Sequence, residues 1–179
     1  MDEKTVSSKL IYDGEVIKMK VDTVKLTNGI ITTREIINHN GSVAIVALDN
    51  DKVSLLMVRQ YRKAVEEAIL EVPSGTLELD EDPLDCAYRE LEEETGYIAK
   101  HMEKIGSIMI SPSFLNEKTD IYFAKDLTFS NINLDEDEIL LVEKYSIKEI
   151  LELINREIVT DAMTIAAMHY AIQKGKISI

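Results

Sequence analysis

Alternating hydrophobic and polar positions mark the first 40 residues of the chain. Ile17, Met19 and Val21 alternate with charged residues, and a second alternating run, IITTREII, follows Asn28-Gly29. This pattern predicts an antiparallel hairpin over residues 15–37 with an Asn-Gly turn. Two β-rich runs, SVAIVAL and VSLLMV, come next and are separated by a polar turn. His39-Asn40-Gly41 interrupts the pattern before them, so we place a boundary near residue 40.

The next region changes to helical spacing. Asp82-Pro83 is a favourable start for a helix, and Thr95-Gly96 a favourable end. Between them, apolar residues recur at intervals of three and four. They are Leu84, Ala87, Tyr88 and Leu91. One amphipathic helix is therefore predicted over residues 83–95.

The remaining elements complete an α/β pattern. Strands are predicted at 104–110, 120–124 and 139–145, and all three prolines fall between residues 73 and 112, which predicts irregular loops there. Ser146 to Glu149 form a capping box for a helix to about Arg156, and Thr160-Asp161 open another that ends near Gly175. We predict a mixed sheet covered by helices on both sides in residues 41–179, with a small antiparallel β region in residues 1–40.

Composition narrows the functional classes. The chain has 179 residues, 45% of them hydrophobic, and a formal net charge of −13, which argues against a nucleic-acid partner. Its longest apolar run, residues 43–48, is far too short to cross a membrane, and its N-terminus lacks a basic-then-apolar export signal. We therefore expect a cytoplasmic protein. With one cysteine, Cys86, any metal must be held by oxygen or histidine.

The negative charge is concentrated in one stretch. Residues 66–94 contain twelve acidic residues and a single basic one, Arg89, which leaves a net charge of only −2 for the rest of the chain. Such an excess repels itself unless it is well solvated or a cation neutralises it. A solvated acidic face and a divalent-metal site are therefore the two interpretations.

Spacing along the predicted helix favours the metal site. At 100° per residue, Glu90 and Glu94 fall on one rim of the apolar stripe, and Glu93 lies beside Glu90. Magnesium and manganese prefer such hard oxygen ligands. Arg89 is placed to orient a carboxylate; its alternative role is an ordinary ion pair with Glu93 or Asp85.

These residues resemble the signature of the Nudix hydrolases at every fixed position. Gly75 is followed after five residues by Glu81 and after seven more by Arg89-Glu90-Leu91-Glu92-Glu93-Glu94-Thr95-Gly96-Tyr97. The one small departure from the signature is Tyr97, since the family usually has an aliphatic residue there. The resemblance implies a Nudix α/β/α sandwich that binds Mg²⁺ or Mn²⁺ and cleaves a nucleoside diphosphate linked to another group.

The same resemblance assigns roles by position. It implies Glu90, Glu93 and Glu94 as metal ligands, with the backbone carbonyl of Ser74 as an additional one. Arg89 orients the carboxylates, and Glu81 steadies the loop.

Features outside the signature resemble the ADP-ribose pyrophosphatase branch. Pro112 lies 16 residues after Gly96, and the segments around Arg59, Arg62 and Glu71 are also similar to that branch. The resemblance implies that Arg62 and Arg59 meet the diphosphate, and that Glu117 approaches the terminal ribose or the metals. It further implies an intertwined homodimer formed through residues 1–40, in which Arg34 reaches the partner's substrate. The substrate-binding set is Arg34, Arg59, Arg62, Glu71, Pro112 and Glu117.

An acidic loop at residues 134–138 supplies the candidate general base. The resemblance places the base on a glutamate of a mobile loop at this position, so Glu136 and Glu138 both qualify, and Glu136 is slightly favoured because it lies nearer the loop tip. The leading hypothesis is hydrolysis of ADP-ribose to AMP and ribose 5-phosphate. Another sugar nucleotide such as GDP-mannose, or a dinucleotide, is the first alternative. A domain that senses ADP-ribose without cleaving it is the second, and the complete set of signature residues argues against it.

Overall fold

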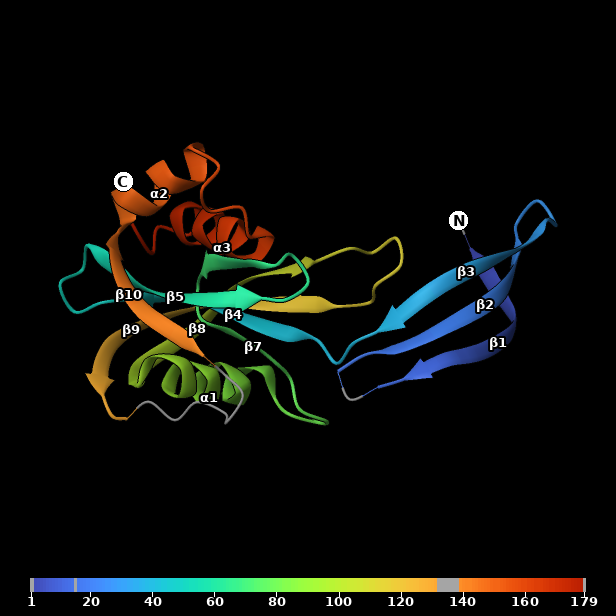
Figure 1. The fold of residues 1–179 in the computed structure, drawn as a ribbon, viewed down its shortest axis with the longest axis horizontal. Helices are drawn as coiled ribbons and strands as arrows, with labels where there is room; N and C mark the ends of the chain where they lie inside the picture. The colour runs from blue at the N-terminus through green and yellow to red at the C-terminus, as the bar shows by residue number, and fades with distance from the viewer. Residues whose placement is uncertain (1, 15, 132–138, 179) are drawn as a thin grey trace. The chain divides into compact units, whose positions relative to one another are not determined.

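The computed structural model describes residues 2–14, 16–131 and 139–178, and its ribbon is shown in Figure 1. The strands are β1 (Glu3–Asp13), β2 (Lys18–Leu26), β3 (Ile31–Asn38), β4 (Ser42–Leu48), β5 (Ser54–Arg62), β6 (Glu67–Glu71), β7 (Ser74–Thr76), β8 (Tyr97–Met109), β9 (Lys118–Phe129) and β10 (Leu140–Ser146). The helices are α1 (Pro83–Thr95), α2 (Ile147–Asn155) and α3 (Ala162–Gln173). In these described residues, no helix is both long and apolar enough to span a membrane.

The chain divides into two compact units. Unit 1 contains Met1–Gly41 and Met109–Lys118, and unit 2 contains Ser42–Ile108 and Thr119–Ile179. Residues 109–118 join the N-terminal segment through backbone bonds: the amide of Ile37 donates to the carbonyl of Phe114 (2.7 Å), and that of Asn116 donates to the carbonyl of Ile37 (3.2 Å). Unit 1 is therefore built from two separate pieces of the sequence.

Unit 1 is an antiparallel sheet in the order β1-β2-β3. The predicted hairpin of β2 and β3 is confirmed: Gly29 at its turn has φ 86°, and the side chain of Asn28 accepts a bond from the amide of Ile30 (3.1 Å). The alternating pattern did not single out β1, which pairs with β2 and is exposed at all of its eleven positions.

Unit 2 contains the predicted mixed sheet, in the order β10-β5-β4-β9-β8, with β6 paired to β5 and β7 paired to β4. β4 and β9 run parallel, whereas β4 and β5 run antiparallel. β7 and β8 both lie within the stretch for which prolines predict loops. Pro73 and Pro112 lie just outside these two strands, so neither removes a ladder hydrogen bond.

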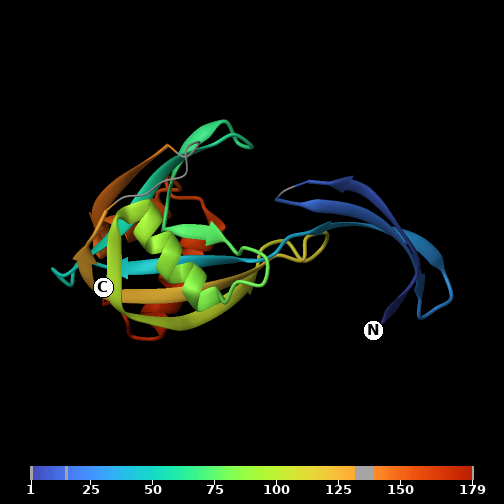
Figure 2. The same ribbon diagram turned by 90° about the horizontal axis from the view of Figure 1, so that it is seen from below.

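Helices cover both faces of this sheet, as Figures 1 and 2 show: α1 lies on one face, and α2 and α3 lie on the other. Alternate residues of β4 divide between the two cores, as the pleat of a strand requires. Ala44 and Val46 pack in the core with Ile150 and Met168, whereas Val43, Ile45 and Ala47 pack in the core with Leu91. This is the predicted α/β/α arrangement. It packs α1 against β4, the strand that also pairs with β7.

Candidate active site

The signature helix is held at both ends as its sequence predicts. The side chain of Asp82 accepts a hydrogen bond from the amide of Leu84 (2.8 Å), and Pro83 begins the helix. Gly96 ends it in the left-handed conformation, with φ 74° and its amide donating to the carbonyl of Glu92 (2.8 Å). These caps fix the helix, and with it the directions of its carboxylates.

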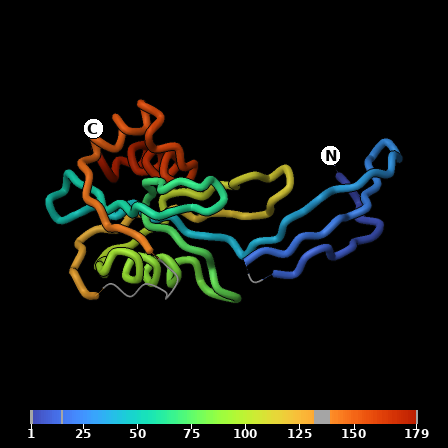
Figure 3. The backbone as a smooth tube through the Cα atoms, viewed as in Figure 1, coloured from blue at the N-terminus to red at the C-terminus, as the bar shows by residue number. Residues whose placement is uncertain are grey.

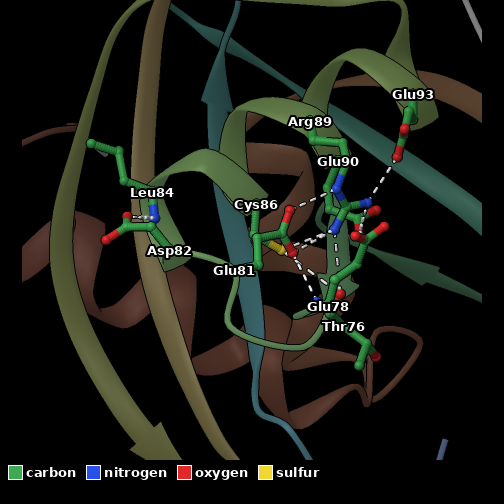
Figure 4. Close-up of polar contacts among 9 residues, drawn as sticks. All are labelled: Thr76, Glu78, Glu81, Asp82, Leu84, Cys86, Arg89, Glu90 and Glu93. Atoms are coloured by element: carbon green, nitrogen blue, oxygen red, sulfur yellow. Dashed lines mark hydrogen bonds and ion pairs between the residues drawn. The ribbon is translucent and has the colours of Figure 1, made fainter.

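Arg89 is the centre of the polar network in Figure 4. Its Nε and Nη2 donate to the two carboxylate oxygens of Glu81, at 2.8 and 2.9 Å. Its Nη1 donates to Glu90 (2.7 Å) and to Glu93 (2.9 Å), while Nη2 also reaches the carbonyl of Thr76 (3.4 Å). The predicted interactions with Glu90 and Glu93 are thus present, and among the described residues the alternative partner Asp85 forms no ion pair with Arg89.

Charge pairing changes the pKa of the groups around Arg89. Hydrogen bonds from Arg89 lower the pKa of Glu81 to about 2, against the opposing effect of burial, and the amide of Glu78 contributes a further bond. The same carboxylates raise the pKa of Arg89. Glu81 therefore remains ionised and ties the loop to the helix. Burial raises the pKa of Cys86, so its thiol stays protonated and is a poor nucleophile.

Two close contacts connect β7 to the helix. The carboxylate of Glu94, which is 2% exposed, accepts a hydrogen bond from the amide of Ser74 (2.9 Å). A Cβ atom placed on Gly75 would lie 1.8 Å from the carboxylate carbon of Glu90. Only glycine at this position therefore leaves room for Glu90.

The backbone of Ser74 is turned toward the same helix. Ser74 lies opposite Ala44 in the β4–β7 register, and the amide of Ile45 donates to the carbonyl of Pro73 (2.8 Å). Hydrogen-bonded and non-hydrogen-bonded pairs alternate along an antiparallel ladder, so Ser74 is at a non-hydrogen-bonded pair and its carbonyl points away from β4. That carbonyl lies on the side of the strand where its amide meets Glu94.

The donor set suits a hard divalent cation. Glu90 and Glu93 share one nitrogen of Arg89, which demonstrates that their oxygens can satisfy a positive charge together. Among the described residues, no three His, Cys, Asp or Glu side chains are gathered as a ready-made metal site. Glu90, Glu93 and Glu94 nevertheless supply carboxylate oxygens within five residues of one helix, and Ser74 supplies a carbonyl oxygen nearby.

The two arginines of β5 are both engaged by acids. Arg62 donates from Nε to Glu71 of β6 (3.0 Å), and Arg59 donates to Glu143 of β10 (2.5 Å) and to the hydroxyl of Tyr145 (3.2 Å). Burial raises the pKa of Glu71, and its attraction to Arg62 opposes that rise. Arg62 is 38% exposed in its side chain, so it keeps an open flank for another anion.

Three predicted substrate residues belong to unit 1. Arg34 donates from Nη2 to Glu3 (2.7 Å) within the N-terminal sheet. Pro112 and Glu117 lie in residues 109–118, and Glu117 approaches Nδ1 of His39 at 4.0 Å. Their roles toward a substrate stay predictions. Glu136 and Glu138 lie outside the described residues, so the choice between them also stays a prediction.

Sequence reasoning named the backbone carbonyl of Ser74 but missed three other backbone groups of this site. The carbonyl of Thr76 accepts from Arg89, the amide of Glu78 donates to Glu81, and the amide of Ser74 donates to Glu94. Backbone groups are common to all residue types, so no residue identity could have indicated them. In the sequence, only the fixed spacing between Gly75 and Glu81 reflects these backbone contacts.

The fold and site define a class, and the comparisons agree with it: a model of the NUDIX domain matches residues 38–163. The chain belongs to the Nudix family. It is 40% identical to the ADP-ribose pyrophosphatase of Bacillus subtilis (strain 168), across 95% of this chain and 92% of that protein. It is 42% identical to the methanol dehydrogenase activator of Bacillus methanolicus, across 94% and 92% respectively. A crystal structure of an ADP compounds hydrolase shares the fold, with a TM-score of 0.85, 20% identity and coverage of 98% and 96%.

Proposed function

We propose that this Nudix protein hydrolyses the diphosphate of ADP-ribose, so that one water yields AMP and ribose 5-phosphate. The observation that carries this proposal is the complete signature network, in which Arg89 holds Glu81, Glu90 and Glu93 together. A chain that only bound its ligand would not require this set of charged residues. The relative from Bacillus subtilis named ADP-ribose pyrophosphatase supports the substrate.

Mg²⁺ or Mn²⁺ is the proposed cofactor. Glu90, Glu93, Glu94 and the carbonyl of Ser74 would hold it, because they are the hard oxygen donors that α1 and the neighbouring strand β7 supply. When bound, such a cation neutralises the diphosphate and makes a water molecule more acidic.

The remaining groups position the reactants. Arg89 fixes the directions of the carboxylates, since it donates to Glu81 of the loop and to Glu90 and Glu93 of the helix. Arg62 and Arg59 supply guanidinium groups for phosphate oxygens, for which the planar fork is well suited. Glu71 orients Arg62 by accepting from it. Pro112 and Glu117 are proposed to shape the pocket for the terminal ribose.

The test is a substrate panel with Mg²⁺ and with Mn²⁺, resolved by chromatography. The panel contains ADP-ribose, GDP-mannose and a dinucleotide. We expect AMP from ADP-ribose at the highest kcat/KM. Cleavage of another sugar nucleotide in preference to ADP-ribose would preserve the Nudix chemistry and overturn the substrate. Stoichiometric binding of ADP-ribose without products would instead support the sensing alternative.

Glu136 is proposed as the general base, with Glu138 as the other candidate. Glu136→Gln should lower turnover by roughly 10²- to 10⁴-fold while metal and substrate affinities stay near those of the wild type. Glu138→Gln is the matched control and should be milder. Normal turnover in Glu136→Gln together with a large loss in Glu138→Gln would assign the general base to Glu138. Normal turnover in both variants would show that the base does not lie on this loop.

A cytoplasmic homodimer is the proposed state of the protein, with no nucleic-acid or membrane partner. Residues 1–40 are proposed to form the dimer contact, and Arg34 is proposed to reach the substrate of the partner. Arg34→Ala should then raise KM without changing metal affinity. An unchanged KM in a confirmed dimer would remove Arg34 from the substrate site.

A second candidate function rests on the relative named methanol dehydrogenase activator, which is 42% identical to this chain. Activation of a dehydrogenase is proposed as a use of the same site. Purified methanol dehydrogenase from Bacillus methanolicus would be assayed with the wild type and with Glu94→Gln. Faster methanol oxidation that disappears with the variant would support this candidate; no acceleration would reject it.

A further inference from the structure

Unit 2 contains a pocket at the end of the sheet opposite the signature loop. The pocket has a volume of about 760 Å³ and is bordered by the β4–β5 turn, the first residues of α2 and the segment after α3. Val43 of β4 pairs with Gly75, whereas Leu48, five residues further along the strand, lines the pocket. At about 3.3 Å per residue, these positions are roughly 16 Å apart. Figure 3 shows the β4–β5 turn and the loop after β7 at opposite ends.

The pocket has an apolar floor. Phe123, Ile147 and Ile177 line it and are 5% exposed or less. Val53, which is 59% exposed, contributes apolar surface at its mouth. A volume between about 300 and 1,000 Å³ with largely apolar walls is typical of small-molecule sites.

Positive charge surrounds this floor. Lys52, Lys125 and Lys148 line the pocket and are exposed, and in the parts of the chain that the structure describes they have no acidic partner. The formal net charge of the chain is −13, so a group of unpaired lysines is unexpected. Each unpaired ammonium group is available to an anion.

Two of the three acids that line the pocket are each paired with a lysine. Asp49 accepts from Lys144 (2.6 Å), and Glu103 is 2.7 Å from the ammonium group of Lys176. Asp126 lies 3.5 Å from Nε2 of His101. Neither Asp49 nor Glu103 is therefore left to neutralise the three unpaired lysines.

Backbone and side-chain bonds hold the pocket walls in place. Asn50 in the β4–β5 turn donates to the carbonyl of Leu127 (2.7 Å) and accepts from its amide (3.1 Å). The amide of Ile147 donates to the carbonyl of Val53 (3.0 Å), which joins the first turn of α2 to the same β4–β5 turn. The pocket is therefore formed before any ligand arrives, and binding costs little ordering.

We propose that this pocket binds an organic phosphate monoester, separately from the signature site. Ammonium groups are well suited to a compact phosphate dianion, and the apolar floor accepts the organic part of such a molecule. A polyanion such as nucleic acid is disfavoured, because the whole chain carries a formal net charge of −13. The proposal does not depend on the substrate that the signature residues cleave.

The experiment is an NMR titration of the whole protein, kept free of metal with a chelator and labelled with ¹⁵N. Phenyl phosphate is the probe. Phenol tests binding of its organic part alone, and inorganic phosphate tests binding of its anionic part alone. We expect saturable shifts at the amides of Asn50, Lys148 and Gly175, with little change at Gly75 and Gly96. Both halves should bind more weakly than phenyl phosphate.

Charge variants decide the role of the lysines. Lys148→Gln should weaken phenyl phosphate binding about tenfold, as expected for the loss of one charged hydrogen bond, and Lys125→Gln should do the same. Lys174→Gln is the matched control, since Lys174 is exposed, belongs to the same unit and does not line the pocket. Shifts confined to Gly75 and Gly96, equal affinity for inorganic phosphate, or equal weakening by the control would each overturn the proposal.

Discussion

The signature region and the N-terminal sheet differ in how their side chains are accommodated. Charged groups are paired in the first, and apolar groups are exposed in the second. In the signature region, one arginine binds three carboxylates and Glu94 binds a backbone amide, all within unit 2. In the N-terminal sheet, apolar side chains such as Leu10 and Tyr12 are more than half exposed. A sheet with an uncovered apolar face is stable only when another surface covers it.

The cores of the two units differ in the same way. Unit 2 has a core on each face of its sheet, whereas Val24 is the single buried hydrophobic residue among the described residues of unit 1. One buried valine cannot offset the conformational entropy lost by the 51 residues of unit 1. The charge network of the signature region is thus satisfied within unit 2, whereas unit 1 leaves apolar side chains exposed, and this exposed surface is the basis of the homodimer proposal.

Glu94→Gln is the variant expected to have the largest effect on the signature region. The amide retains an oxygen that can accept from Ser74, but the charge of a proposed metal ligand is lost. We expect weaker Mg²⁺ binding and a loss of several kcal/mol of catalysis, roughly 10³-fold in turnover. Glu92→Gln on the same helix is the control, since Glu92 forms no ion pair with Arg89 in the part of the chain that the structure describes. Equal activity of the two variants would contradict the assignment.

Gly75→Ala tests whether the close approach of Glu90 matters. The new Cβ would meet the carboxylate of Glu90 at 1.8 Å, so Glu90 has to move. A displacement of this size should cost roughly 10²-fold in turnover, with little change in the midpoint of thermal unfolding. Combined with Glu90→Gln, the substitution should add almost nothing, because both act through one carboxylate. Fully additive losses would mean that Gly75 has another role.

The dimer prediction tests the other half of the comparison. Leu10→Ser with Tyr12→Ser removes exposed apolar surface from β1, and we expect the dimer dissociation constant to rise roughly 10- to 100-fold. Leu79→Ser is the control, because Leu79 is 83% exposed but lies in unit 2. Sedimentation velocity provides the measurement. A wild-type protein that sediments only as a 20.2 kDa species at micromolar concentration would rule the dimer out.

Glu81→Gln should have the smallest effect and a characteristic pH dependence. Arg89 lowers the pKa of Glu81 from 4.5 to about 2 on folding, so the charged form stabilises the folded state. This contribution is complete above about pH 4.5, falls between pH 4.5 and 2, and is absent below that range. Urea unfolding should find the variant roughly 1–2 kcal/mol less stable at pH 7. The difference from the wild type should vanish near pH 2, and a difference independent of pH would exclude the charge pair as its cause.

Local signals predicted much of unit 2. Asp82-Pro83 and Gly96 bound α1 as expected, and the capping box at Ser146 begins α2. These features depend on residues that are close in sequence, so their chemistry is visible without a fold. The same holds for the ion pairs of Arg89. Glu90 is the next residue along the helix, and Glu93 lies about one helical turn further on.

Long-range contacts were beyond the reach of sequence patterns. The sequence of β1 alternates too little for the strand to be recognised. All of its side chains are exposed, so its backbone pairing with β2 is what defines it as a strand. Arg59 was expected to meet a phosphate, yet Glu143, 84 residues away, already accepts from it. Residues 109–118 join unit 1 through Ile37, which no local pattern could indicate.

The parallel pairing of β4 with β9 has a consequence for synthesis on the ribosome. Ser42 and its neighbour Thr119 are 77 positions apart, so at about 5–20 residues per second β9 emerges roughly 4–15 s after β4. During that delay, β5 and β7 can already pair with β4, but the edge of β4 that will receive β9 has no partner. The nascent chain therefore carries an apolar open edge for seconds, and this interval is when chaperones or neighbouring chains would encounter it.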